Sequence, residues 1–579
     1  MTTTIDVEHL LSPDQLAVEV GNQWSEWRML RQNWTDQTKE IRNYVYATDT
    51  TSTANAILPW SNTTTTPKLT QIADNLHANY TATLFPQANW VRWTASSMED
   101  AKEFKAKRIK GYMGTKIKQS KFVQTHHELL RDYILYGNAF SMIKWVDDYS
   151  VMENGEVHQR YKGPMLCRIS PYDIMFNPAA TSFIDSPKII RSLKTLGELK
   201  READHNGNLV FKEAFEKTMS ARAHVRSTDA HYEKGEGFTA DGFSNIQQYY
   251  NSDYVEVLTF YGDMYNKENG EFLTDRKITI IDRAYVVGNE ENPSWHGRAP
   301  IHHVGWRERP DNLIAMGPLD NLIGLQYRID HLENLKADVF DQIAYPVLKI
   351  KGDIEDFDFE PGARIYLGEE GDVAYLQPDA TALQADMQIN QIQQLMEELA
   401  GAPKQAMGIR TPGEKTAFEV QSLQNSASRI FEHKTAHYER VFIEVQLNDM
   451  LAMAARLLDT EDMIEVVDED SGAQVFQRIT KEDIIGKGSI EPMGARHFAE
   501  RARRVQQLQQ LWQIKANDPT VAVHLSGKEF ARLMAHELGE EDLFQENVAI
   551  SEQAAAQKFG QELALVHEEQ GQMAMEEGI

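Results

Sequence analysis

The sequence predicts an α+β protein of several domains that is dominated by long helices. Three observations lead to this fold class. The chain has 579 residues, which is long enough for several domains. Its first half reads as helices followed by strands, the order typical of α+β folds. Residues 415–458 contain neither glycine nor proline, and at about 1.5 Å per residue they predict one helix of roughly 65 Å.

The composition is that of an ordinary soluble globular protein, with 41% hydrophobic and 25% charged residues. Cys167 is the one cysteine, which excludes an intrachain disulfide framework and a cysteine-only zinc site. No apolar run approaches the ~20 residues of a membrane span. The first residues lack the basic and apolar blocks of a signal peptide. We therefore expect a protein that is made in the cytoplasm and does not insert directly into a membrane.

The formal net charge of -28 bears on nucleic-acid binding. It argues against wrapping nucleic acid through a dominant basic face, because such binding depends on cations that neutralise phosphates. An acidic wall that surrounds DNA and lets it slide remains compatible with this charge. More often, a high net charge simply keeps a protein soluble.

Hydrophobic periodicity divides the first half of the chain into elements. Apolar residues three or four apart predict helices over 14–46, 68–84 and 98–137. Alternating residues predict strands over 139–145, 164–169, 254–261, 272–282 and 283–287, with the first two joined by a hairpin at Asn154-Gly155. The residues at 48–66 and 204–248 are polar and read as a loop and an exposed excursion.

From Gly317 onward the order of the predicted elements becomes distinctive. A helix, a strand-rich insert, a second helix, a glycine- and proline-rich loop and the very long helix follow one another at Pro318–Ile343, Val347–Leu376, Ala382–Leu399, Gly401–Glu414 and Lys415–Leu458. A hairpin at 463–467 and 474–479 comes next. Helices are predicted over 496–515, 527–538 and 550–575.

Charge is uneven along this region. The insert carries eight acids against Lys351 and Arg364, namely Asp353, Glu355, Asp356, Asp358, Glu360, Glu369, Glu370 and Asp372. The flanking helices are acidic as well, which suits a channel wall and a solvent-exposed helical hairpin equally. The nearby cations are Lys404 and Arg410 in the loop and Lys415 just after it. Isolated bases of this kind suit transient phosphate contacts, but also an ordinary connection.

Signals for enzymatic chemistry are weak. The chain lacks the phosphate-binding pattern G-x-x-x-x-G-K-[ST] and the nucleophile pattern G-x-S-x-G, and the glycine cluster Gly111–Lys116 has the wrong spacing. Neighbouring residues point in different directions, so the pairs His126-His127 and His302-His303 are poor metal ligands. Acidic pairs such as Glu397-Glu398 read as solvated faces. We therefore expect no catalytic residues, no cofactor and no metal.

The ordered set of elements resembles the portal proteins of tailed bacteriophages, the head-to-tail connectors. Three segments are similar in style, and the last of them suggests the short-tailed type: RDYILYGNAFSMIKW at Arg131–Trp145, RISPYDIMFNP at Arg168–Pro178 and MGARHFAERARRVQQLQQLW at Met493–Trp512. The likeness extends from about Asp14 to Lys515. The last forty residues match no pattern of this family.

The resemblance implies a portal-type subunit with wing, stem, clip and helical crown. Its parts would be a wing at 1–316, stem helix 1 at 317–346, a clip at 347–378, stem helix 2 at 379–400, a tunnel loop at 401–414, a long tunnel or wing helix at 415–458, a wing β-hairpin at 459–492, and a crown with an acidic tail at 493–579.

The resemblance also implies a non-enzymatic function in the virion. About twelve copies would form a ring at one capsid vertex, assembled in the host cytoplasm, and double-stranded DNA would pass through it during packaging and ejection. Lys404, Arg410 and Lys415 would face the DNA channel. The acids of the clip would bind the terminase large subunit, which is the packaging ATPase, and later the tail or adaptor proteins. Major capsid and scaffolding proteins would be further partners.

Two alternatives stay open. Another head–tail adaptor or tail structural protein is the nearer one, although such adaptors are usually shorter. A metal-dependent DNA-processing enzyme is the other, and it would need converging carboxylates. Stable rings without catalysis would favour the portal function, whereas metal-dependent cleavage of DNA would favour the enzyme.

Overall fold

The structure is a computed structural model, and it describes residues 14–46, 62, 64–85, 90–97, 100, 103–151, 157–206, 212–217, 254–266, 270–292, 299–345, 347–351, 372–376, 384–401, 430–459, 461–467, 474–493, 504–505, 507–513 and 527–538. The chain forms two compact units. The first comprises Met1–Glu465 and Phe476–Gly494, and the second Val466–Val475 and Ala495–Ile579. In the second unit, helix α18 (Gly527–Leu538) stacks Phe530 on Trp512, with 4.6 Å between the ring centroids.

Two of the three helices predicted near the N-terminus are each divided in two. Helices α2 (Gln15–Leu30) and α3 (Gln32–Tyr46) replace the single helix predicted over 14–46. They separate at Arg31, a buried residue whose Nη1 donates to the carbonyl oxygen of Ile174 at 2.8 Å. Helices α5 (Glu103–Gln119) and α6 (Phe122–Leu135) replace the single helix predicted over 98–137 and separate at Lys121. Helix α4 (Lys68–Leu84) has the predicted bounds.

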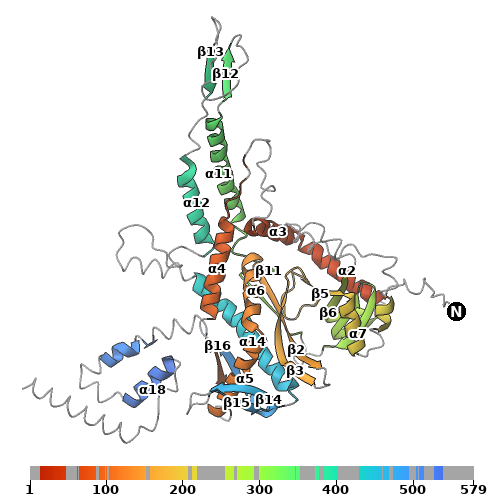
Figure 1. The fold of residues 1–579 in the computed structure, drawn as a ribbon. Helices are drawn as coiled ribbons and strands as arrows, with labels where there is room; N and C mark the ends of the chain where they lie inside the picture. Colours follow the sequence, from red (N-terminus) through yellow and green to blue (C-terminus); the bar gives the residue numbers. More distant parts are fainter. Residues whose placement is uncertain are drawn as a thin grey trace, which may run out of the picture. The chain divides into compact units, whose positions relative to one another are not determined.

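The strands of the first unit form antiparallel sheets (Figure 1). Strands β2 and β3 pair as the predicted hairpin, with β9 on the other side of β2. A five-stranded sheet has the order β4-β5-β6-β7-β8. The bounds are β2 Asn138–Val151, β3 Val157–Ile169, β4 Ile174–Phe176, β5 Lys188–Thr195, β6 Tyr254–Asn266, β7 Glu271–Ile281, β8 Tyr285–Glu291 and β9 Ile301–Gly305.

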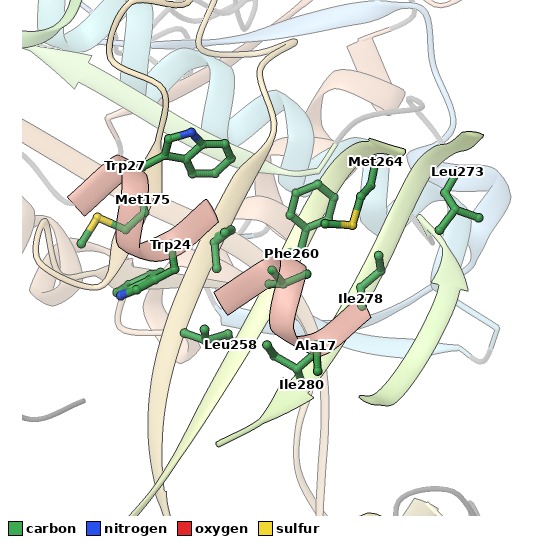
Figure 2. Close-up of a cluster of buried hydrophobic side chains, with 12 residues drawn as sticks. Ala17, Trp24, Trp27, Met175, Leu258, Phe260, Met264, Leu273, Ile278 and Ile280 are labelled. Carbon is green, nitrogen blue, oxygen red and sulfur yellow. The ribbon is translucent and has the colours of Figure 1, made fainter. Parts of the chain in front are cut away.

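Helices cover both faces of the five-stranded sheet. Successive side chains of each strand point to opposite faces, so both faces can be apolar. Leu258 and Phe260 of β6 pack with Trp24 and Trp27 of α2 on one face, as Figure 2 shows. Val255 and Val257 of the same strand point to the other face. There they pack with Leu199 of α7 (Leu196–Asn206) and with Ala214. The sheet is thus the centre of the hydrophobic core.

Shorter strands join distant parts of the chain or make small hairpins. Strand β1 (Val91–Ala95) pairs with β16 (Gly488–Pro492), almost four hundred residues later. Strands β10 (Arg307–Arg309) and β11 (Asn312–Met316) form a tight hairpin. Strands β14 (Asp462–Val467) and β15 (Gln474–Ile479) pair as the sequence predicts.

The prediction that long helices dominate the fold is wrong. The described residues hold sixteen strands in six sheets, and the longest uninterrupted α-helix among them, α11, has 22 residues. The fold is an α+β mixture in which the antiparallel sheets form the core. The sequence underestimated the strands because β1, β9, β10, β11 and β16 have five residues or fewer. Segments this short carry almost no periodic signal.

The helix predicted over 415–458 is also not a uniform α-helix. Its described part is helical from 430 to 457, but Glu439–Ile443 form a π-helix (η2) before α14 (Glu444–Leu457). In an α-helix, Tyr438 and Gln446 would point about 80° apart, because each residue turns by about 100°. The extra residue in the π-helix brings both onto one face. There they bind the two ring nitrogens of buried His126, at 3.2 and 2.9 Å.

Candidate functional site

The candidate site is the helical hairpin that follows β11. Helix α11 (Ile323–Ala344) leads into β12 (Val347–Lys351), which pairs with β13 (Asp372–Leu376), and α12 (Asp386–Leu399) returns beside α11 (Figure 1). Helix α11 begins at Ile323 and not at Pro318 as predicted. The five intervening residues form turns instead, in which the Gly317 amide donates to the Asp320 carboxylate at 2.9 Å. Buried Leu319 and Leu322 anchor these turns.

The Tyr-Gly-Asn-Ala segment at 136–139 holds the base of α11 in place. Gly137 has a φ of +67°, and a Cβ on it would lie 2.3 Å from the backbone nitrogen of Gly317. Only glycine accepts both the conformation and this close approach. The Asn138 side chain donates to the Ala315 carbonyl and accepts from the Ala315 amide, each at 2.9 Å. These contacts explain why glycine and asparagine occupy positions 137 and 138.

A strap made of Asn62 and residues 64–66 lies along α11. Side chains at every fourth position of the helix bind its backbone. The Asn334 side chain accepts from the Thr64 amide at 2.9 Å and donates to the Thr64 carbonyl at 3.0 Å. The Thr66 amide donates to Asp330 at 2.9 Å, and Gln326 donates to the Thr66 carbonyl at 2.6 Å. The side chains of α11 therefore bind Thr64 and Thr66 through their main-chain groups.

Two further acids of α11 bind the other end of the strap. The Asn62 amide donates to Asp338 at 2.7 Å, and the Asn62 side chain donates to Asp341 at 2.8 Å. The sequence left the acids of this helix as a channel wall or a solvated surface. Of these acids Asp330 is buried, Asp338 is partly buried and Asp341 is exposed, and all three bind a segment of the same chain.

The carboxyl group of Asp330 is strongly perturbed by this arrangement. Burial raises the pKa of Asp330 to about 6, although the Thr66 amide and the Gln326 side chain both donate to the group. Both donors bind Oδ1, while Oδ2 is buried without a hydrogen-bond partner among the described residues. A carboxylate with one unsolvated oxygen favours its neutral form.

Helix α12 is tied to the same region by a buried ion pair. Lys68, the first residue of α4, lies 2.6 Å from the Glu397 carboxylate, and their side chains are only 5% and 6% exposed. The prediction that Glu397 lies on a solvated face is therefore wrong. Since residues 64–67 run directly into α4, the strap binds α11 and its continuation binds α12. This segment fixes both helices of the hairpin.

The outer half of α11, residues 335–344, differs from the inner half. All buried residues of α11 lie between Ile323 and Asn334. Beyond them, large apolar side chains stay exposed on both helices and on the strands, namely Leu335, Phe340, Ile343, Tyr345, Ile350, Met387, Leu395 and Leu399. Phe340 is 53% exposed, and Met387 is 71% exposed. Monomeric soluble proteins rarely leave such a group uncovered.

Most of the predicted site residues lie outside the part of the chain that the structure describes. This applies to Lys404, Arg410 and Lys415 and to all but one acid of the clip: Asp353, Glu355, Asp356, Asp358, Glu360, Glu369 and Glu370. The remaining acid, Asp372, is exposed at the start of β13, where it lies opposite Lys351 of β12. The site residues therefore stay predictions.

The histidine pairs are engaged within the fold. Burial lowers the pKa of His126 to about 3 and that of His303 to about 3, so both rings are neutral. His303 stacks on Phe140 and contacts the Asn138 side chain at 3.0 Å. In the described ranges, no three His, Cys, Asp or Glu side chains gather as metal ligands do. None of the helices described here is both long and apolar enough to cross a membrane.

Comparisons with known proteins add no relative. No protein-family model matches this chain, and no curated protein matches it.

One feature of the sequence was compatible with the strap, but the apolar pattern that predicted the helix made it easy to overlook. Gln326, Asp330, Asn334 and Asp338 are polar and four residues apart, slightly more than one turn, so they form a stripe along a helix that otherwise carries many apolar residues. Such a stripe predicts a polar partner. No signal in the sequence connects Lys68 with Glu397, because the two residues belong to separate helices and are 329 positions apart.

Proposed function

We propose that this chain is the portal subunit of a tailed bacteriophage. In this proposal about twelve copies form a ring at one capsid vertex, and double-stranded DNA enters and leaves through it. The proposal rests on the order of elements, in which a helical hairpin with a β-ribbon precedes a glycine- and proline-rich loop and a long helical segment. The chain would act in the virion and as a structural protein.

The exposed apolar side chains of the helical hairpin are the observation that carries the proposal. Residues 335–344 of α11 include large apolar side chains but no buried position, so they need another surface to cover them. The β12–β13 ribbon needs support too, because an isolated two-stranded hairpin is marginally stable in water. Identical neighbours in a closed ring would cover the helices and brace the ribbons of every copy.

The same arrangement suggests how the partners would bind. The ribbon and its acidic insert would form the clip, to which the packaging ATPase and later the tail or adaptor proteins would bind. The tunnel-loop cations Lys404, Arg410 and Lys415 would touch DNA phosphates transiently. The force for packaging would come from the separate ATPase, since the chain lacks a phosphate-binding loop of the G-x-x-x-x-G-K-[ST] type.

Native mass spectrometry combined with negative-stain imaging tests the proposal. Purified full-length chain should give closed rings of about twelve copies with a central hole. The measurement should be repeated at high protein concentration, because ring closure depends on mass action. A chain that stays monomeric or dimeric at high concentration, and that cleaves DNA with magnesium or manganese, would contradict the portal function.

A further inference from the structure

A second feature of the chain concerns nucleic acid but lies outside the helical hairpin. Residues 101–121 carry eight basic side chains against one acid, in a chain whose net charge is -28. The bases are Lys102, Lys105, Lys107, Arg108, Lys110, Lys116, Lys118 and Lys121. Most of this segment is helix α5. This segment is therefore strongly basic, whereas the chain as a whole is acidic.

The bases of α5 fall into two groups with different surroundings. Lys105, Arg108 and Lys116 form ion pairs with Asp100, Asp483 and Asp462, respectively. Lys116 is buried, and its Nζ also donates to the carbonyl of Lys162 at 2.6 Å. These three bases hold α5 in the fold.

The other group forms a stripe on the outer face of the helix. Lys107, Lys110 and Lys118 lie at positions i, i+3 and i+11, which share one side of an α-helix. Lys110 and Lys118 are exposed, as is Lys121 directly after the helix. The opposite side is buried and carries Ile109, Tyr112, Met113 and Ile117. The lysine stripe therefore faces away from the core.

Two details indicate that this stripe suits a close ligand. Gly114 lies on the same face, at i+7 from Lys107, and a Cβ placed on it would meet no atom within 4 Å. The space beside Gly114 is thus open. Lys121 has a φ of 55°. This left-handed conformation is unfavourable for most residues other than glycine, asparagine and aspartate. A lysine in this conformation gives up local stability and extends the row of positive charge.

We propose that the lysine stripe of α5 (Lys107, Lys110, Lys118 and Lys121) binds the phosphate backbone of double-stranded DNA without sequence preference. Lysines on flexible stems suit phosphates as point charges. At about 1.5 Å per residue the stripe spans roughly 20 Å, comparable to six base pairs at about 3.4 Å each. The stripe shares no residue with the predicted channel loop, and the proposal does not depend on ring formation.

The surroundings of the stripe favour duplex DNA over other polyanions. Among the described residues between Tyr46 and Tyr149, no large apolar side chain is exposed, and the single exposed one beside an element packed on α5 is Ile485, directly after α15 (Lys481–Ile484). An acidic protein partner or a membrane surface would need apolar anchors beside the charges. A single strand would need exposed aromatic rings for stacking, yet Tyr112 of α5 is fully buried. The surface therefore suits contact with the phosphate backbone of duplex DNA.

Binding of a fluorescent duplex of about 30 base pairs and mixed sequence tests the proposal, with the full-length chain titrated between roughly 50 and 200 mM salt. The test variant combines Lys110→Gln, Lys118→Gln and Lys121→Gln. A matched control combines Lys144→Gln, Lys200→Gln and Lys212→Gln, which are exposed lysines outside α5. Both variants change the net charge equally, so the difference between them isolates the stripe from any other DNA contact.

We expect the test variant to bind at least about tenfold more weakly than the control at low salt. Its slope of log affinity against log salt should fall by about one for each lysine removed. Lys121→Gly should lower the slope by about one while raising the unfolding midpoint, because glycine suits the left-handed conformation. Equal binding by the test and control variants would overturn the proposal. Binding of poly-glutamate in preference to the duplex would overturn it too, and would point to an acidic protein instead.

Discussion

At the residue scale, Asp330 couples the helical hairpin to the strap through a carboxyl group that burial destabilises. Oδ1 accepts from the Thr66 amide, while Oδ2 is buried and lacks a partner within the described ranges. Burial raises the pKa to about 6 in the folded protein, against a value of about 3.8 when solvated. The folded state therefore binds this proton more tightly than the unfolded state. By linkage, the stability that Asp330 contributes is fully present below about pH 4 and is lost as the pH rises through about 6.

The substitution Asp330→Asn should remove this loss of stability at high pH. Asparagine keeps the acceptor for the Thr66 amide and stays neutral, so it imitates the protonated acid. We expect the variant to be more stable than the wild type above pH 7, by on the order of 1–3 kcal/mol. The difference should vanish near pH 4. Thermal unfolding of both proteins across this pH range measures it, and a variant that is less stable at every pH would disprove the coupling.

At the scale of the element, the π-helix at Glu439–Ile443 adapts one helix to a buried polar network. Gln446 donates to Ser141 at 2.7 Å through its amide nitrogen, so its oxygen accepts from His126. The other ring nitrogen of His126 then accepts from the Tyr438 hydroxyl. These residues come from α6, β2 and two segments of one helix. Most buried polar groups form hydrogen bonds, and the π-helix lets Tyr438 and Gln446 both reach His126.

Deleting Val441, which is 39% exposed, should convert the π-helix into regular α-helix. Tyr438 and Gln446 would then be seven residues apart, and in an α-helix such residues share a face. We expect a folded protein with stability within ~1 kcal/mol of the wild type, since no buried side chain is removed. Deleting Ala452 in α14 is the control.

The control deletion lies in regular α-helix, where there is no extra residue whose loss would restore the register. It would rotate buried Ala454 and Leu458 by about 100° away from the core. We expect this variant to be insoluble or to unfold at a clearly lower temperature, as measured by circular dichroism. If both deletions were tolerated equally, the π-helix would have no role in setting the register.

At the scale of the whole molecule, the first unit is well packed at its sheets and uncovered at the outer half of α11. The buried clusters join α2, α7 and the five-stranded sheet. The inner half of α11 is held by the strap and by the segment at 136–139, whereas residues 335–344 contribute nothing to the core. The proposed ring explains this asymmetry, since the uncovered half would be an interface between copies.

The substitution Phe340→Glu should prevent ring assembly while the chain stays folded. Phe340 is 53% exposed, so a charge there costs little in the monomer but is unfavourable in an apolar interface. Phe272→Glu on β7 is a matched control, because Phe272 is 60% exposed and lies outside the hairpin. Native mass spectrometry should show rings for the control and single subunits for the test variant. Rings of normal size from Phe340→Glu would exclude this half of α11 from the interface.

Local patterns in the sequence were enough to predict much of the fold. The bounds of α4, the β2–β3 and β14–β15 hairpins and the positions of strands β6 and β7 follow from the spacing of apolar residues within one element. The helix–ribbon–helix order of the candidate site was predicted in the same way, although α11 begins five residues later. Periodicity is a property of neighbouring residues, so it is visible without tertiary structure.

The sequence by itself determined the order of elements, the acidic charge and the basic segment of α5. Only the tertiary structure decided which distant residues meet: Gly137 with Gly317, Lys68 with Glu397, and the strap with α11. It also decided that sheets form the core and that the helical segment 430–457 contains a π-helix. The reason is physical, because these features arise where separate segments must satisfy buried polar groups and close packing together.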